Sequence, residues 1–564
     1  MVMMFRKTIY KGIMKKYFII ALAALGFAAC AEKMNDGPSP EQTGELEQSY
    51  IAINLMSSEL DTRVNDDDPE LEDGEEAERK VNSVHFFFFR QGVPFAVNAA
   101  GTAPGGGKNW LTATPNFTVD TEDANISDYS EVTLVLNNYK GQYPDQIVAV
   151  INWNPDKEVY KLDELHTKLA GIQSTESGFV MSNSVYKSSD NKVIDATTIS
   201  GTYNTPAEAE AQPVNIYVER VAAKVKVSTP KSDIDGKWDA EKKRFDTGKT
   251  SGLTTLGESQ NKVYVKIENW SLYNARTQSN LLKSIDPEWT DEALGLTWND
   301  IPRFRSYWAY ADAYSGTYTN GNTFNWSNGN LLETSAYCGE NTASLEGSRT
   351  KLILKGKLVD EAGNAFELVK WNGQELVKVE NLKKAVAAQL QYLVYSYTDE
   401  DDATTYTSIT DADIECISGA NAGSPSDVEE YEVYFQLTST ATTGKSWAIK
   451  TGDSWETKDA THINTYLIEH VPAAIVYMSG QTYYYIDIKH LGTSGKDAEY
   501  GIVRNHIYDI EIQSIKGYGT PVYGSTDNII VPETPIEEEG VYVAAKINVL
   551  SWRVVKQGVN IDVQ

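Results

Sequence analysis

The chain has 564 residues and a formal net charge of −29 at pH 7, from 79 acidic and 50 basic side chains. This length exceeds what one hydrophobic core holds and suggests about two to four domains. Phosphate binding needs a basic stripe, so we expect no nucleic-acid partner for so acidic a chain. The 33 tyrosines, 12 tryptophans and 40 glycines, with short apolar runs between them, favour β-structure.

The N-terminus has the pattern of an export signal. Two lysines precede an apolar run over residues 17–27, which is too short to span a bilayer but has the length of a signal-peptide core. The run leads through two alanines into Cys30, an arrangement that resembles the lipobox of bacterial lipoproteins. We predict a lipoprotein signal peptide over residues 1–30 with Cys30 as the lipid site. An ordinary secretory signal cut nearby is the alternative.

A polar tether and a short strand follow the signal. Residues 31–48 are polar and contain two prolines, a composition typical of a linker. Residues 50–56 alternate in the manner of a strand. One face of this predicted strand carries Ile51, Ile53 and Leu55.

The segment after this strand is strongly acidic. Arg63 and Val64 stand just before the block NDDDPELEDGEEAER, which ends at Arg79. Such a charge block cannot pack in a core, so we predict a long exposed loop, and exposed loops are where proteases cut. The Arg63–Val64 bond is therefore a candidate processing site, with Arg79 as the second arginine beside the loop. A calcium loop is the weaker alternative, because the carboxylates lack the EF-hand spacing.

Residues 81–229 are predicted to form a first β domain. Its strands are the β-branched and aromatic runs 81–89, 132–136, 146–153 and 214–227. The last of these is predicted as one long strand. A charged stretch without an apolar period begins at residue 228, which places the predicted domain boundary near residue 229.

Residues 230–540 repeat this character with longer loops. One helix is predicted over residues 380–397, where apolar side chains keep close to a helical period, and the acidic stretch 398–426 is predicted as loop. The predicted strands are 262–269, 350–359, 430–437, 481–488 and 507–515.

The C-terminal residues 541–564 read as a long strand. Apolar residues alternate with polar ones up to Val549, the phase changes after Leu550, and alternation resumes after Gly558. Such a strand exposes unpaired backbone groups, so it must pair either within its own domain or with another molecule. From the residues alone it is either the closing strand of a sandwich or a strand given to a partner.

Catalytic and metal-binding patterns are poor. None of the six histidines stands in an HExxH or HxH spacing, and no GxSxG motif occurs. Carboxylate pairs for glycoside hydrolysis stay possible, but nothing in the sequence selects a pair. Cys338 and Cys416 can form at most one disulfide, and their pairing is left open. We therefore predict no enzyme, no cofactor and no metal site.

Six stretches along the chain resemble one family of bacterial surface proteins. They are QIVAVINW (146–153), ERVAAKVKV (219–227), RSYWA (305–309), YCGENT (337–342), RNHIYDIEIQSIKGYGTP (504–521) and INVLSWRVV (547–555). In this order they resemble the Mfa-type fimbrillins, the major shaft subunits of the minor fimbriae of Bacteroidales-type bacteria. The resemblance implies an all-β fold of two β-sandwich domains with transthyretin-like topology and few short helices. It also implies export as a lipoprotein to the outer membrane.

The resemblance further implies how the chain would assemble. An Arg-specific protease would cut at Arg63–Val64 or at Arg79 and remove the lipidated segment with the first strand, which carries Ile51, Ile53 and Leu55. The emptied groove would accept residues 541–564 of a neighbouring copy as a donor strand. The donor side chains would be Ile547, Val549, Leu550, Trp552, Val554, Val559, Ile561 and Val563.

The function that follows is structural and adhesive. The resemblance implies a surface fimbria built from copies of this chain, with anchor and tip proteins as further partners and with membrane attachment only through the lipid of the precursor. The first alternative is a surface lipoprotein of a nutrient-uptake system in which exposed Trp and Tyr side chains stack on glycans. The second is an exported glycoside hydrolase.

Overall fold

The structure is a computed structural model, and the residues that it describes form mostly strands together with five short α-helices. The predicted all-β class is confirmed. The residues that it describes are 46–58, 78, 80–97, 107–113, 118–119, 126–139, 142–172, 178–187, 192–251, 262–284, 324–325, 329–343, 346–376, 378–400, 403–422, 432–490, 500–523, 528–529 and 542–551.

One mixed sheet, here called the N-terminal sheet, organises the first part of the chain. Its strands follow the order β3-β2-β7-β9-β13-β1-β6-β5, and β4 and β12 pair with β2 and β7. Strands adjacent in the sheet are mostly distant in sequence, so the sheet is held by long-range pairing. The main strands are β1 (Leu46–Ser58), β2 (Val84–Arg90), β6 (Ile126–Tyr139), β7 (Gln146–Ile151), β9 (Met181–Asn183) and β13 (Val214–Arg220). The short ones are β3 (Val93–Pro94), β4 (Trp110–Ala113), β5 (Thr118–Val119) and β12 (Thr197–Thr198).

Strands β2, β7 and β9 of the N-terminal sheet are buried on both faces. Phe86 and Phe88 of β2 enter one core, while Phe87 and Phe89 enter another, because successive side chains of a strand point to opposite faces. The first core also receives Leu134 of β6, which lies toward the other end of the strand order. The sheet therefore curves around this core, and the run of four phenylalanines is explained by burial on both sides.

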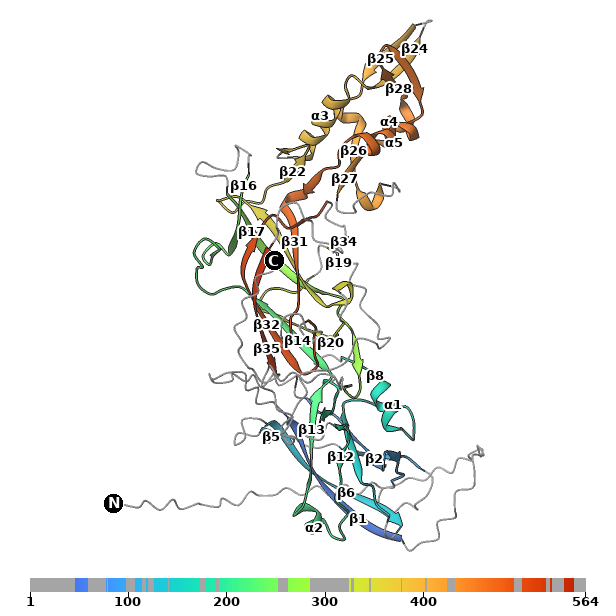
Figure 1. Ribbon diagram of the computed structural model, residues 1–564, viewed down its shortest axis with the longest axis vertical. Helices are drawn as coiled ribbons and strands as arrows, with labels where there is room; N and C mark the ends of the chain where they lie inside the picture. Colours follow the sequence, from blue (N-terminus) through green and yellow to red (C-terminus); the bar gives the residue numbers. More distant parts are fainter. Residues whose placement is uncertain are drawn as a thin grey trace, which may run out of the picture.

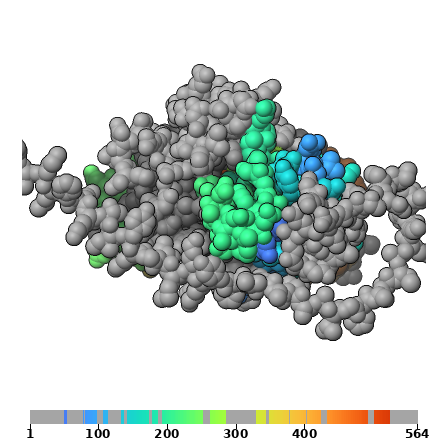
Figure 2. Space-filling view, turned by 90° about the horizontal axis from the view of Figure 1, so that it is seen from below, coloured from blue at the N-terminus to red at the C-terminus, as the bar shows by residue number. Residues whose placement is uncertain are grey.

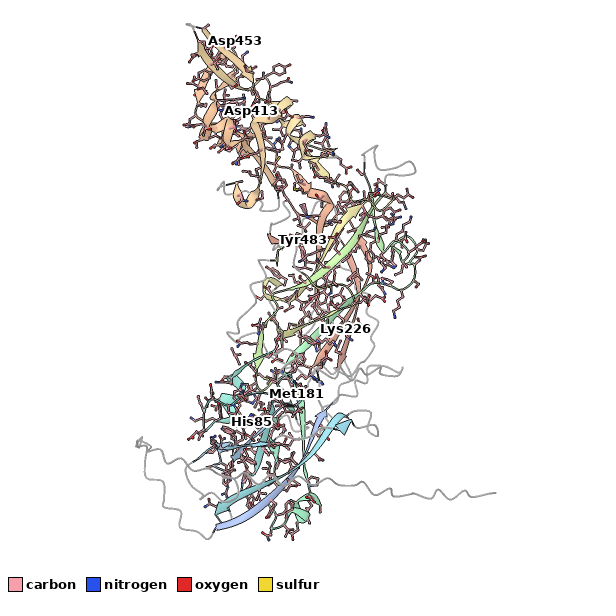
Figure 3. All side chains as sticks on the ribbon, turned by 180° about the vertical axis from the view of Figure 1, so that it is seen from behind. His85, Met181, Lys226, Asp413, Asp453 and Tyr483 are labelled. Atoms are coloured by element: carbon pink, nitrogen blue, oxygen red, sulfur yellow. The ribbon has the colours of Figure 1, made fainter. Side chains whose placement is uncertain are left out.

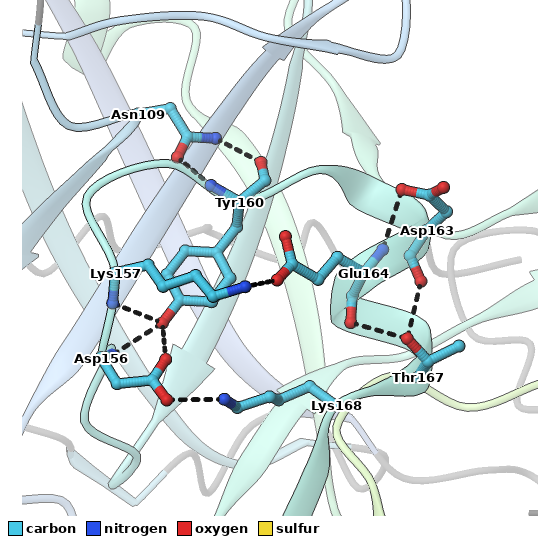
Figure 4. A network of polar contacts seen from close by, with 8 residues as sticks. All are labelled: Asn109, Asp156, Lys157, Tyr160, Asp163, Glu164, Thr167 and Lys168. Atoms are coloured by element: carbon cyan, nitrogen blue, oxygen red, sulfur yellow. Dashed lines mark hydrogen bonds and ion pairs between the residues drawn. The ribbon is translucent and has the colours of Figure 1, made fainter. Parts of the chain in front are cut away.

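A polar network closes the second core (Figure 4). Buried Tyr160 exchanges hydrogen bonds with Asn109, whose Oδ1 accepts from the Tyr160 backbone N at 2.9 Å and whose Nδ2 donates to the Tyr160 carbonyl at 3.0 Å. The Tyr160 hydroxyl accepts from the backbone N of Asp156 at 2.7 Å. Burial raises the pKa of Tyr160 to about 12, and its hydrogen bond to Asp156 adds to the shift. This network holds α1 (Leu162–Thr167) and β8 (Leu169–Gly171) against the sheet.

The predicted single strand 214–227 is wrong. The chain leaves the N-terminal sheet at the end of β13 and enters a different sheet as β14 (Ala222–Ser228). Val221 lies between the two strands and is fully buried. The β-branched residues stand at even positions up to Val218 and at odd positions from Val221 onward, so the alternation changes phase where the chain changes sheet. This change lies upstream of the boundary predicted near residue 229.

Two sheets pack face to face in what we call the C-terminal sandwich. Ile510 and Ile512 from one sheet meet Val265 and Leu354 from the other in a single core, the arrangement of a β-sandwich. The first sheet has the order β20 (Ser335–Gly339), β14, β32 (His506–Lys516) and β35 (Tyr542–Ser551). The second has the order β15 (Trp238–Asp239), β16 (Arg244–Thr250), β17 (Lys262–Tyr273), β21 (Lys351–Val359), β31 (Gln481–Asp487) and β33 (Thr520–Pro521).

A separate α+β unit, here called the inserted unit, lies between β21 and β31. It begins with Leu368 and ends with Tyr477, which face each other where β22 pairs with β30. It has its own core, which includes Leu382, Phe435 and Trp447. Its elements are β22 (Leu368–Trp371), β23 (Gln374–Leu376), α3 (Val379–Leu390), β24 (Val394–Glu400), β25 (Ala403–Ser408), β26 (Ile414–Ser418), β27 (Val433–Leu437), α4 (Ser439–Gly444), β28 (Ser446–Thr451), β29 (Ser454–Lys458), α5 (Ala460–His470) and β30 (Ile475–Tyr477).

Two predictions for the inserted unit are wrong. The helix expected over 380–397 ends at Leu390, because the residues from Val394 onward pair as a central strand with β25 and β28. The stretch 398–426, expected as loop, contains the strands β25 and β26. Their residues are polar on the exposed side, and cross-strand pairing rather than an apolar pattern fixes them.

The three parts follow one another along the molecule (Figure 1). The N-terminal sheet lies at one end, the C-terminal sandwich in the middle and the inserted unit at the other end. Figure 3 shows the same order by residue, from His85 and Met181 through Lys226 and Tyr483 to Asp413 and Asp453. The remaining elements are α2 (Pro206–Glu210), β10 (Tyr186–Lys187), β11 (Val193–Ile194), β18 (Gln278–Asn280), β19 (Phe324–Asn325) and β34 (Asn528–Ile529).

Candidate functional site

The first strand, β1, fills a slot inside the N-terminal sheet. On one side it pairs in parallel with β13, and on the other it pairs antiparallel with β6 from Leu46 to Ser58. A strand between two others uses its backbone groups on both edges. Here β1 is joined to neither neighbour by a hairpin, since both come much later in the chain. We call the position that β1 occupies the slot.

The apolar side chains of β1 anchor it in the slot. Ile51 and Ile53 are both predicted to face one side. They are 1% and 0% exposed and belong to the core around which the sheet curves. Leu55 lies in the same strand opposite Ile216 of β13. Burial of each large aliphatic side chain contributes about 1.5–3 kcal/mol. The predicted strand 50–56 is thus a long strand with a buried face.

Further contacts hold β1 from the side of α2. Tyr50 and Tyr203 exchange backbone hydrogen bonds of 2.8 and 3.0 Å. Figure 2 shows this end of the molecule, where the green segment that includes α2 lies beside the blue of β1. The N-cap Thr205 accepts a hydrogen bond from the Glu208 backbone N, and Pro206 begins the helix, which fixes α2 at this place.

The C-terminal strand β35 lies at the edge of its own sheet. It pairs antiparallel with β32 along its whole length, from Tyr542 opposite Lys516 to Ser551 opposite His506. Three predicted donor residues therefore face partners of their own chain: Ile547 faces Ile510, Val549 faces Tyr508 and Leu550 faces Ile507. The structure thus joins the first part of the predicted donor strand to the C-terminal sandwich, and the donor role stays a prediction.

Several predicted site residues lie outside the described residues. Cys30, Arg63, Val64 and Arg79 are among them. So are the last donor residues, Trp552, Val554, Val559, Ile561 and Val563. Their lipidation, cleavage and strand-donation roles stay predictions.

Glu78, at the end of the acidic segment, is fixed at the junction of the two large parts. Its side chain is fully buried and pairs with the equally buried Lys224 of β14 at 2.6 Å. The hydroxyl of Tyr337 in β20 donates to the same carboxylate. The Glu78 carbonyl accepts from Nε of Arg220 in β13 at 3.2 Å. Sequence reasoning missed this cluster, because Glu78 stands in a charge run that reads as solvated.

More buried charges line the same junction. Lys283 pairs with Glu219 of β13 at 3.0 Å, and Nε of Arg504 donates to Oε2 of Glu340 at 2.8 Å. Burial lowers the pKa of Lys283, and the charge of Glu219 opposes this shift. Strand β8 also pairs with β18 across the junction. Removing one partner of a buried ion pair leaves an uncompensated charge, so these pairs fix the junction in one arrangement.

The two described cysteine thiols lie apart from each other and form no common site. Cys338 and Cys416 are free thiols in different cores, and burial raises the pKa of both to about 12. Among the described residues no group of three or more His, Cys, Asp and Glu side chains is placed to hold a metal ion. Within the same residues no helix has the length and apolarity to cross a membrane.

The comparisons with known proteins point to one family. Residues 475–558, which include β31, β32 and β35, match the family model described as the major fimbrial subunit protein type IV, fimbrillin, C-terminal. No curated protein matches the chain.

Several solved structures are similar over most of this chain or of theirs. A fimbrilin (FimA) from Porphyromonas gingivalis is 13% identical, covers 90% of this chain and 98% of its own, and gives a TM-score of 0.38. The tip fimbrial protein Mfa3 from the same species is 10% identical, covers 88% and 99%, and gives 0.28. A fimbrial assembly protein from Parabacteroides distasonis is 10% identical, covers 57% and 91%, and gives 0.29. These TM-scores are too low to support a functional conclusion. Through its C-terminal segment 475–558, however, the chain is similar to the fimbrillins, which confirms the resemblance read from its sequence.

Proposed function

We propose that this protein is a structural subunit of a surface fimbria, which polymerises by strand exchange. The observation that carries the proposal is the slot: β1 is the first described strand, is buried between β13 and β6, and is tied to neither by a hairpin. A strand with these properties is removable by a cut in the chain after Ser58. The C-terminal match to the fimbrillins supports the same function.

The proposed sequence of events begins at the N-terminus. The chain is exported, lipidated at Cys30 and held at the outer membrane as a precursor with β1 in the slot. An Arg-specific protease cuts the Arg63–Val64 bond, after which only non-covalent contacts hold β1. The C-terminal tail of a second copy then replaces it, in the manner of strand addition to a sheet.

The contacts of β1 explain why the precursor stays monomeric. Ile51 and Ile53 contribute about 1.5–3 kcal/mol each when fully buried. The ladder bonds to β6 and β13 add about 0.5–1.5 kcal/mol each. Ordering a strand costs about 1–2 kcal/mol per residue, so the net affinity is much smaller than the sum. An incoming tail therefore competes with β1 for the slot and does not enter an empty one.

The described part of the tail suggests that two parts of the C-terminal strand have different roles. In this proposal β35 stays paired with β32 and covers the edge of its own sheet, while the residues after Ser551 carry the donor side chains Trp552, Val554, Val559, Ile561 and Val563 into the neighbour. Ile547, Val549 and Leu550 then anchor the donor to its own subunit. In this proposal the first part of the tail is the closing strand of its own sheet, and the last part is the strand donated to a neighbour.

The proposed partners and location follow from assembly. The partners are copies of this chain, together with anchor and tip proteins of the same fimbria. The mature protein lies in a fimbria at the cell surface and mediates adhesion or biofilm formation. The lipid stays with the removed segment.

A glycan-binding lipoprotein is the second candidate, because the inserted unit carries a partly exposed aromatic cluster. Tyr406 of β25 and Trp455 of β29 stack with ring centroids 3.7 Å apart, and Tyr395 meets Trp455 edge-on at 4.6 Å. The Lys450 ammonium lies 5.3 Å from the Trp455 ring centroid. These rings are already stacked on one another, which favours a structural role. A glycan binder also stays monomeric and keeps its lipid.

Limited digestion tests the proposal. The purified precursor is treated with an Arg-specific protease and followed by mass spectrometry and size-exclusion chromatography. We expect a new N-terminus at Val64 and a subsequent shift from monomer to polymer. Arg63→Gln is the matched variant and should remain monomeric. A protein that stays monomeric after a complete cut at Arg63 would favour the glycan-binding alternative.

A further inference from the structure

The residues on either side of Arg79 are bound to the folded protein by their backbone groups. The Glu78 carbonyl accepts from Arg220 at 3.2 Å, and the Lys80 carbonyl accepts from Nδ2 of Asn152 at 2.7 Å. The backbone N of Asn82 donates to Oδ1 of the same Asn152 at 2.8 Å. Residues 78, 80 and 82 around the Arg79–Lys80 bond are thus hydrogen-bonded to Arg220 at the end of β13 and to Asn152 just after β7.

The side chain of Glu78 adds the strongest of these ties. Its carboxylate pairs with Lys224 at 2.6 Å with both side chains fully buried, and it accepts from the Tyr337 hydroxyl. Lys224 and Tyr337 face each other on β14 and β20 of the C-terminal sandwich. The single residue Glu78 therefore joins the start of β2 to the C-terminal sandwich and, through Arg220, to the N-terminal sheet.

Proteolysis of a folded chain requires the cut segment to become accessible and extended, so its rate follows the local opening of that segment. Opening at residues 78–80 would leave Lys224 buried without its counter-charge, and a lost partner in a buried pair is strongly unfavourable. The bond after Arg79 is then protected although it follows a block of acidic residues.

We infer that Glu78 sets the downstream limit of processing: its buried contacts with Lys224, Tyr337 and Arg220 exclude cleavage after Arg79 and confine the Arg-specific cut to Arg63. Glu78 is a positioning residue and takes no part in the cleavage chemistry. The mature chain then begins at Val64 and keeps its acidic segment, attached at the junction of the two large parts. This inference rests on the proposed processing, since it specifies which of two arginines is used.

The test is made in the full chain with Arg63→Gln, so that it does not depend on cleavage at Arg63. Three variants are compared in that background: no further change, Glu78→Gln, and Glu456→Gln as a control. Glu456 pairs with Lys458 on the surface of β29 at 2.8 Å, in the inserted unit at the other end of the molecule. Each protein is digested with an Arg-specific protease, and the fragment beginning at Lys80 is quantified by mass spectrometry. A peptide of residues 72–86 shows that the free sequence is a substrate.

We expect the Glu78→Gln protein to release the Lys80 fragment at least about tenfold faster than the other two, because the buried pair with Lys224 is broken. Tyr337→Phe removes one hydrogen bond at the same carboxylate and should give a smaller increase in the same direction. Circular dichroism and cleavage at the buried Arg244 show whether a variant is folded. If Glu78→Gln unfolds, Tyr337→Phe decides the test.

Two results would overturn the inference. Rapid release of the Lys80 fragment from the Arg63→Gln protein with Glu78 intact would show that the bond is not protected. Equal slow release from the folded Glu78→Gln and Tyr337→Phe proteins, with the peptide cut rapidly, would show that other contacts protect it. Neither result bears on whether the tail exchanges with β1, so this inference and the proposed polymerisation fail separately.

Discussion

Ile53 of β1 lies opposite Val214 of β13 in parallel register, and on its other side it lies opposite Val132 of β6. A parallel pair cannot be closed by a hairpin, so no tight turn ties these two residues together. Ile53 is nevertheless fully buried. Strand β1 is therefore held firmly by non-covalent contacts, but no short covalent connection joins it to either neighbouring strand. Strand replacement requires both properties.

The buried side chains of β1 should stabilise the folded precursor with β1 in the slot. Ile53→Ala leaves a cavity in the core, and we expect it to lower the free energy of unfolding by about 2–5 kcal/mol. Urea denaturation of the uncut protein measures this. Val93→Ala is the control, because Val93 is 64% exposed and should change the value by less than about 0.5 kcal/mol. After the cut at Arg63, Ile53→Ala should also speed polymer formation.

Two truncations should separate the two roles of the C-terminal strand. Removing residues 552–564 leaves β35 in place, so we expect an unchanged melting temperature and no polymer. Removing residues 542–564 uncovers the edge of β32 and should lower the melting temperature or cause aggregation. Thermal melting and size-exclusion chromatography measure both. Collapse of the shorter truncation would mean that the whole tail belongs to its own sandwich.

The inserted unit should be dispensable for the fold of the rest. Lys370 faces Ile475 where β22 pairs with β30, so residues 371–474 can be replaced by the two-residue turn Asn-Gly. Because the unit has its own core, we expect the shortened protein to remain folded and to polymerise after cutting. Circular dichroism and electron microscopy test this. Unfolding of the shortened chain would show that the unit supports the sandwich.

His85 should make the protein less stable in mild acid. Burial, together with the charge of Lys108, lowers its pKa from 6.5 to about 4. The unfolded chain therefore binds the proton at higher pH than the folded chain, and stability falls as the pH falls from 6.5 toward 4. The variant His85→Gln should lose less stability between pH 7 and pH 5 in urea denaturation. Identical losses in both proteins would mean that His85 titrates normally.

The parts of the fold that the sequence predicts are those that local runs of β-branched and aromatic residues control. The runs around Phe86, Val148 and Ile510 form strands as predicted. The first two are continuous apolar runs buried on both faces, and the third has period two. The first strand was also predicted, with Ile51 and Ile53 on its buried face. What alternation cannot show is the sheet that a strand joins. The change of sheet at Val221 was missed although the alternation changes phase between Val218 and Val221.

The inserted unit and the Glu78 cluster were missed for a related reason. Strands such as β25 are polar, and their pairing with neighbours rather than an apolar pattern fixes them. Glu78 looks solvated in the sequence, and its partners Lys224 and Tyr337 lie far away in the chain. Interactions between distant polar residues leave no periodic signal, so they become visible only in the folded structure.

The central claim is that the tail of one copy enters the slot of another, and cross-linking of mixed isotopic copies tests it most directly. A photo-reactive residue replaces Val559 in ¹⁵N-labelled protein, which is cut at Arg63 and polymerised with unlabelled copies. We predict cross-links from the labelled tail to unlabelled peptides of β6 or β13, with β1 lost from the polymer. Cross-links confined to the same copy, or a polymer that retains β1, would contradict the account.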